Sequence, residues 1–151
     1  MSSGICITGR FFVAIYDGPE MVSYVEAKNK ILKQGLVYIL NGGAIGSLDT
    51  IKIGTGNSPT SYTQTDLESP LTNNSGVPFG SLSGLGEYES GFINYFPVGY
   101  ATGEWKELGA SSSSVNLFNR AILPFPVNKT AFQTAFAGVI FTVDRVTADD
   151  A

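Results

Sequence analysis

The sequence predicts a mainly β protein, either a sandwich or a barrel, and three observations carry this prediction. The chain has 18 glycines and 7 prolines among 151 residues, together with many Ser, Thr and Asn residues, so turns are frequent. Only 15% of the residues are charged, against roughly 25% in typical soluble domains. Short apolar runs bounded by turn residues recur, whereas long helix-forming tracts are scarce. We expect one domain over residues 1–146 and a frayed polar tail at 147–151.

The first element is an expected β-hairpin. Residues Ile5 to Tyr16 are rich in Ile, Phe and Val, and Asp17-Gly18-Pro19 is a turn signal. A second apolar run follows from Met21 to Val25. The pattern predicts two antiparallel strands at the start of the chain.

One amphipathic helix is expected next, between Asn29 and Leu40. Its apolar residues recur at spacings of three to four, with Asn29 as a candidate N-cap and Asn41-Gly42-Gly43 as the stop. Gly35 lies inside this segment, where glycine costs roughly 1 kcal/mol relative to alanine. Either the helix is weakened there, or Gly35 allows another element to approach closely. The apolar positions of the segment are Ile31, Leu32, Leu36, Ile39 and Leu40.

A strand ending in Gly54-Thr55-Gly56 invites comparison with a phosphate-binding loop. Such a loop needs its glycines to open a helix whose N–H groups point at the anion. Here Pro59 and several Ser and Thr residues follow instead, and they favour extended or turn conformations. We therefore expect the glycines to serve the backbone conformation, and residues 55–70 to form a long polar loop that contacts partners.

The rest of the chain alternates between apolar runs and turn segments. We expect separators at 84–86, at the serine-rich segment 109–114 and at 126–129. The remaining strand candidates are Val77 to Leu82, Gly91 to Tyr100, Thr102 to Leu108, Val115 to Phe125 and Ala131 to Val146.

Charge and cysteine content exclude several function classes. The formal charge is −4 and the basic residues are scattered, so no stripe of cations is available for nucleic acid. Cys6 is the single cysteine, and its neighbours Ile5 and Ile7 favour a buried or half-buried thiol rather than a reactive one. We expect neither a secretory leader nor a membrane span.

Candidate catalytic residues are few, because the chain has no histidine. A Ser-His-Asp or Cys-His mechanism is therefore impossible, and no EF-hand pattern indicates a metal. The carboxylate pairs Glu87/Glu89 and Asp149/Asp150 are interpreted as solvated turns or tail residues. Around Glu104 and Glu107, strand alternation predicts that Trp105 and Glu107 share one face, with Trp105 packed on a core or a subunit contact. We expect no enzyme activity and no cofactor.

Several segments resemble small virion proteins of tailed bacteriophages. Ile51-Lys52-Ile53-Gly54-Thr55-Gly56, followed by Pro59-Thr60 and Thr65-Asp66-Leu67, is similar to one of their motifs. Thr102-Gly103 with Glu107 and Gly109, then Leu117-Phe118-Asn119-Arg120-Ala121 and Val127-Asn128-Lys129-Thr130, resemble their C-terminal half. The resemblance spans roughly residues 20–143. It implies a β-sandwich structural protein of the particle and no catalytic residues. Two departures from the family pattern are the serine-rich segment 109–116 and the opening hairpin.

Together these observations give a leading hypothesis and two rivals. The leading one is a non-enzymatic, jelly-roll-like β-sandwich with one short helix that decorates a phage capsid. The rivals are a tail, neck or fibre adaptor, and a carbohydrate-binding module that stacks sugars on its aromatic side chains. Candidate interaction residues are Phe11, Phe12, Tyr62, Tyr88, Tyr95 and Trp105.

For the leading hypothesis we expect other virion subunits as partners, assembly in the host cytoplasm, and a homo-oligomer, with a trimer favoured. The segments expected to touch neighbours are the hairpin from Ile5 to Val25 and the loop from Thr55 to Pro70. On this view, deletion of residues 1–17 weakens particle association more than it weakens the core.

Overall fold

A long β-hairpin opens the chain, as the sequence predicted. The computed structural model describes residues 3–82, 85–86 and 88–147. Strands β1 (Ser3–Asp17) and β2 (Glu20–Ile31) pair from Arg10↔Lys28 to Asp17↔Glu20. Gly18 has φ of +57°, a value that glycine adopts readily in a tight turn.

The helix is shorter than its apolar pattern suggested. It is α1 (Lys33–Leu40), and the residue before it, Leu32, gives no side-chain cap. The expectation that Asn29 caps the helix is wrong, because β2 continues through Asn29, which pairs with Ala121. Leu40 is 83% exposed, while Tyr38 and Ile39 pack against the core. The apolar stripe of this segment is therefore only partly buried.

Gly35 of α1 allows the close approach that the sequence left open. A Cβ atom at this position would collide with the backbone carbonyl of Phe118. The Leu32 N–H also donates to the Phe118 carbonyl oxygen at 3.0 Å. The start of the helix thus lies directly against the chain just before β8.

The remaining strands match the predicted runs with shifted boundaries. A short 3-10 turn, η1 (Ile45–Ser47), precedes β3, and β4 was not predicted. The segments 109–111 and 126–129, expected as separators, continue β7 and β8, because pairing with neighbours extends these strands. The strands are β3 (Thr50–Gly54), β4 (Pro70–Ser75), β5 (Val77–Ser81), β6 (Glu89–Phe96), β7 (Gly103–Ser111), β8 (Asn119–Lys129) and β9 (Thr134–Thr147).

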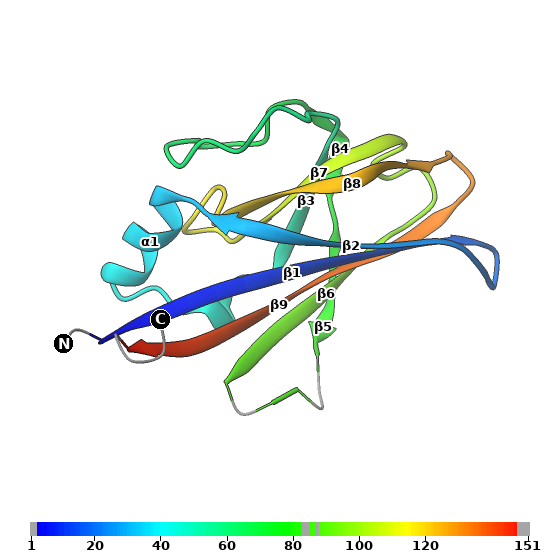
Figure 1. The fold of residues 1–151 in the computed structure, drawn as a ribbon. Helices are drawn as coiled ribbons and strands as arrows, with labels where there is room; N and C mark the ends of the chain where they lie inside the picture. The colour runs from blue at the N-terminus through cyan, green and yellow to red at the C-terminus, as the bar shows by residue number, and fades with distance from the viewer. Residues whose placement is uncertain (1–2, 83–84, 87, 148–151) are drawn as a thin grey trace.

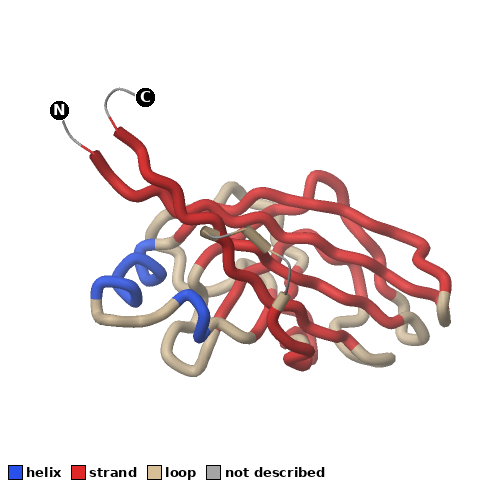
Figure 2. Tube along the Cα trace, turned by 90° about the horizontal axis from the view of Figure 1, so that it is seen from below, coloured by secondary structure: helices blue, strands red, loops and turns tan. Residues whose placement is uncertain are grey.

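The nine strands of the described residues belong to one antiparallel sheet that curls into a flattened, nearly closed barrel (Figure 1). Its strand order is β4-β3-β7-β8-β2-β1-β9-β6-β5. Sheet A comprises β2, β1, β9, β6 and β5, and sheet B comprises β4, β3, β7, β8 and the end of β2. Because β1 and β9 pair along almost their full length, the start of β1 and the end of β9 lie side by side (Figure 2).

Two segments turn the corners between the sheets. At one corner, β2 passes from β1 to β8 between Lys28 and Asn29. At the other, the chain changes partners at Gly76, leaving β3 for β6. The side chain of Asn94 joins β3 to β6 there, since its Oδ1 accepts the Ile51 N–H at 2.7 Å and its Nδ2 donates to the Asp49 carbonyl at 2.9 Å.

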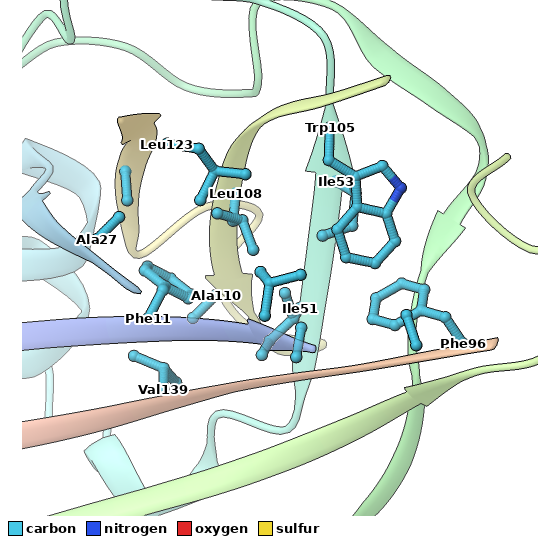
Figure 3. Packing of buried hydrophobic residues seen from close by; sticks show 14 of the residues in the cluster. Phe11, Ala27, Ile51, Ile53, Phe96, Trp105, Leu108, Ala110, Leu123 and Val139 are labelled. Atoms are coloured by element: carbon cyan, nitrogen blue, oxygen red, sulfur yellow. The ribbon is translucent and has the colours of Figure 1, made fainter. Parts of the chain in front are cut away.

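The core fills the space between the two sheets (Figure 3). Phe11 and Val139 of sheet A meet Ile51 and Leu108 of sheet B, while the rings of Phe96 and Trp105 pack edge to face with centroids 5.0 Å apart. Deletion of residues 1–17, expected to weaken particle association more than the core, would remove Phe11 and β1, the strand between β2 and β9. The core would therefore also be weakened, and the comparison with particle association stays a prediction.

The outer faces of the two sheets differ. The loop 55–69 and α1 lie over the outer face of sheet B, where Leu32, Leu67 and Leu117 form a small second apolar cluster. No layer comparable with the loop and α1 covers the outer face of sheet A among the described residues (Figure 1).

In the described part of the chain, no helix is long and apolar enough to cross a bilayer.

Candidate functional site

The outer face of sheet A carries a cluster of aromatic side chains. The inward positions of β1 are Phe11, Val13 and Ile15, so Phe12 and Tyr16 point outward. Strands that are apolar on both faces are typical of sheets covered on both sides. The outward aromatic cluster consists of Phe12, Tyr16, Phe79, Tyr95 and Phe136, from β1, β5, β6 and β9.

Phe136 lies at the centre of this aromatic cluster. Its ring centroid is 6.0 Å from that of Tyr16, 5.3 Å from that of Phe79 and 5.1 Å from that of Tyr95. Phe12 covers Gly138 of the neighbouring β9, where a Cβ atom would enter its ring. Phe79 on the edge strand is 64% exposed. Phe79 is thus open to solvent, and the other four aromatic side chains of the cluster are half-buried.

The six predicted interaction residues fall in different places. Phe12 and Tyr95 belong to the aromatic cluster, half-buried on their strands. Phe11 and Trp105 are fully buried in the core, and the Trp105 indole N–H donates to the Ala101 carbonyl at 2.7 Å. These two side chains therefore offer no surface for contact in this conformation.

The other predicted aromatics are exposed at separate sites. Tyr62 is 54% exposed in the loop over sheet B, and Tyr88 is 68% exposed just before β6. Sequence reasoning missed Tyr16, Phe79 and Phe136. The signal that could have found Tyr16 and Phe136 is the apolar character of both faces of β1 and β9, whereas Phe79 lies on β5.

A buried ion pair holds the long loop over sheet B. Glu107 and Arg120 are 0% and 1% exposed, and Arg120 Nε donates to Glu107 Oε1 at 2.8 Å. Glu107 also accepts N–H groups from Gly56 at 2.8 Å, Glu68 at 2.9 Å and Ser69 at 2.8 Å. Arg120 Nη1 in turn donates to the Ser58 carbonyl at 2.8 Å. Both ends of the loop are therefore anchored to one carboxylate.

The alternation expected around Trp105 is broken by a β-bulge. The register of β7 against β8 shifts between Trp105 and Glu107. Trp105 points into the core, whereas Glu107 contacts the loop on the outer face of sheet B. The prediction that these two side chains share a face is wrong for this reason.

The glycines before the loop are explained by the same carboxylate. Neither Gly54 nor Gly56 has a positive φ, so the conformational reason expected from the sequence does not apply. A Cβ atom at either position would lie within 2.6 Å of Glu107 Oε2. The Gly56 N–H donates to this internal carboxylate, as the N–H groups of a phosphate-binding loop donate to the bound anion.

The remaining carboxylates form local contacts. Glu104 pairs with Lys106 at 3.2 Å on the surface, and Glu89 Oε1 accepts the Gly86 N–H at 2.9 Å. Hydrogen bonds from Ser58, and then from the Asn57 amide, hold the pKa of the Glu68 carboxyl below its ordinary value. Glu87, Asp149 and Asp150 lie outside the described residues.

Two further observations concern metal and thiol chemistry. Over residues 3–82, 85–86 and 88–147, no group of three or more acidic or cysteine side chains is placed to hold a metal ion. Cys6 is exposed, which corrects the expectation of a buried or half-buried thiol.

Comparison of the chain with protein-family models, with curated proteins and with solved structures finds no match. The resemblance to phage virion proteins therefore stays a prediction.

Proposed function

We propose that this protein is a non-enzymatic structural subunit of a tailed-bacteriophage particle, a capsid decoration protein with a jelly-roll-like sandwich. It docks onto neighbouring subunits through the aromatic cluster on sheet A. The observation that carries the proposal is this uncovered aromatic face, since large apolar patches on a folded domain mark interaction sites. The resemblance of residues 20–143 to virion proteins supplies the kind of partner.

The geometry of the aromatic cluster favours a protein partner over a sugar. A flat stacking platform needs coplanar rings, but the planes of Tyr16 and Phe79 lie at 86° and 81° to that of Phe136. Edge-to-face rings present an uneven surface that suits the interdigitating side chains of another subunit. For the protein itself we propose a homo-oligomer, with a trimer favoured.

Reassembly on particles that lack the protein tests the proposal. Phe79→Glu places a charge on the exposed edge of the aromatic cluster and should abolish binding to such particles. Leu40→Glu is the matched control, because Leu40 is 83% exposed on α1 and lies outside the cluster. This variant should bind as the wild type does. Equal binding of both variants would contradict docking through sheet A.

Copy counting separates a decoration protein from a tail, neck or fibre adaptor. A decoration protein is expected in numbers comparable with those of the major capsid protein, and an adaptor only in the numbers of a tail ring. If purified particles contain none of this chain, and the isolated chain stays monomeric at high concentration, the structural assignment fails.

A further inference from the structure

An open cavity on the side of sheet B is separate from the aromatic cluster. Its volume is about 810 Å³, which lies within the roughly 300–1,000 Å³ typical of small-ligand sites. Three segments line it: α1 with the turn that follows it, residues 63–65 of the long loop, and the serine-rich segment 112–116. The sequence singled out both loops, and docking through sheet A uses neither.

The lining combines hydroxyl and amide groups with an apolar area that is larger than the polar one. The hydroxyls come from Thr63, Thr65 and the run Ser112–Ser114, and the side-chain amides include Gln34 and Asn116. Val37, Tyr38 and Val115 supply the apolar part. Donors and acceptors beside an apolar wall suit a sugar ring, which has hydroxyls at its rim and C–H groups on its faces.

Lys33 gives the cavity its charge. Among the described residues that line it, Lys33 is the one charged side chain, and it is exposed. No ion pair involves Lys33 in the described part of the chain. Lys52 does not line the cavity, and its Nζ donates to Asn116 Oδ1 at 2.7 Å. The absence of a lining carboxylate favours a ligand that carries negative charge.

Hydrogen bonds between its walls hold the cavity open before any ligand arrives. Gln34 Nε2 donates to the Gln64 carbonyl at 3.2 Å, which ties α1 to the long loop. Asn116 Nδ2 donates to the Thr65 carbonyl at 2.7 Å, which ties the serine-rich segment to the same loop. The Tyr38 hydroxyl donates to the Ala44 carbonyl at 3.0 Å. Such preorganisation lowers the entropic cost of binding.

We propose that this cavity binds an acidic saccharide, with the sugar carboxylate on Lys33 and the ring hydroxyls on the serine-rich segment and the amides. The proposal goes beyond the docking function and does not depend on it. A neutral sugar would leave the Lys33 ammonium unused, and a simple anion would leave the hydroxyls unused. The acidic sugar is the ligand class that uses both.

An NMR titration with D-glucuronate tests the proposal, with D-glucose as the matched neutral sugar and acetate as the simple anion. Glucuronate should shift the amide signals of residues 33–43, 63–65 and 112–116. Glucose should bind at least about fivefold more weakly, which corresponds to about 1 kcal/mol. Glucose binding as tightly as glucuronate, or acetate producing the same shifts with the same affinity, would overturn the assignment.

Two variants and one control locate the site. Lys33→Met should weaken glucuronate binding at least about fivefold and leave glucose binding unchanged. Ser113→Trp should abolish both, because it fills the cavity from an exposed position. Lys28→Met removes an exposed lysine outside the cavity and should change nothing. An absence of shifts with wild-type protein at about 50 mM glucuronate, far above the Kd of a weak site, would overturn the proposal, as would equal binding by wild type and Lys33→Met.

Discussion

At the residue scale, Glu107 organises the loop over sheet B. Its two oxygens accept N–H groups from both ends of the loop and from Arg120. The carboxylate needs close approach of the Gly54 and Gly56 backbone, which accounts for glycine at both positions. In this loop, whose sequence resembles a phosphate-binding loop, the Gly56 N–H thus donates to a carboxylate of the same protein.

Glu107→Gln should destabilise the protein by about 3–5 kcal/mol, since it leaves the Arg120 charge buried without its counterion. The new amide nitrogen would also face N–H donors instead of accepting from them. Urea unfolding monitored by Trp105 fluorescence measures the change. Glu104→Gln is the control, because it removes the exposed Glu104–Lys106 pair and should cost less than about 1 kcal/mol. Similar losses for both variants would contradict the role assigned to Glu107.

Lys129 makes stability depend on pH in the alkaline range. It is fully buried, its Nζ donates to the Pro97 carbonyl at 3.1 Å, and burial lowers its pKa. Above the folded-state pKa the unfolded chain therefore binds more protons than the folded one, so the free energy of unfolding rises with pH towards the unfolded pKa of about 10.4.

We expect this rise to be absent from Lys129→Met. The measurement is the difference in unfolding free energy between wild type and Lys129→Met as the pH increases from neutral to about 10. As the pH rises, the free energy of unfolding of the wild type should increase relative to that of Lys129→Met. A constant difference would show that burial of Lys129 does not perturb its titration.

At the element scale, Gly35 decides how α1 meets β8. Alanine normally favours a helix by about 1 kcal/mol over glycine. Here Gly35→Ala should instead destabilise the protein, because the added methyl group would collide with the Phe118 carbonyl. Thermal unfolding gives the sign of the effect. Gly46→Ala, where no atom lies within 4 Å of the added Cβ, should leave Tm nearly unchanged, and a raised Tm for Gly35→Ala would contradict the close contact.

The elements also show what the sequence could and could not predict. The opening hairpin followed from local signals, since an apolar run, a turn at Gly18 and a second run specify it without distant partners. The helix start did not, because Asn29 is held in β2 by its pairing with Ala121, far along the chain. The Glu107–Arg120 pair was likewise missed, because a bulge reversed the alternation on which the expected face depended.

For the candidate site, the sequence predicted residue types better than positions. Phe12 and Tyr95 were singled out and belong to the aromatic cluster, whereas Trp105 was singled out and lies in the core. Aromatic content alone does not distinguish the two faces of a strand. Only strand pairing brings Phe79, Tyr95 and Phe136 together from three separate segments.

At the scale of the whole molecule, the barrel is closed by a side chain as well as by backbone pairing. Asn94 is 0% exposed and joins β3 to β6 through the Ile51 N–H and the Asp49 carbonyl. Gly76 packs against Asn94 at the point where the chain changes sheets. At this seam the side-chain amide of Asn94 acts together with the backbone hydrogen bond that the Gly76 N–H donates to the Ile51 carbonyl at 2.9 Å.

Asn94→Ala should weaken this seam, because it leaves the buried Ile51 N–H without its partner and removes the bond to the carbonyl of Asp49, an exposed residue. A buried N–H without a partner costs about 1–3 kcal/mol. Asn128→Ala, at an exposed position of β8, is the control and should cost less than about 0.5 kcal/mol. Hydrogen exchange gives the more specific measurement, since the Ile51 amide should lose protection in Asn94→Ala while the amides in the β1–β9 ladder keep theirs. Uniform loss of protection, or none at Ile51, would show that Asn94 does not close the barrel and that the ladders alone hold the two sheets together.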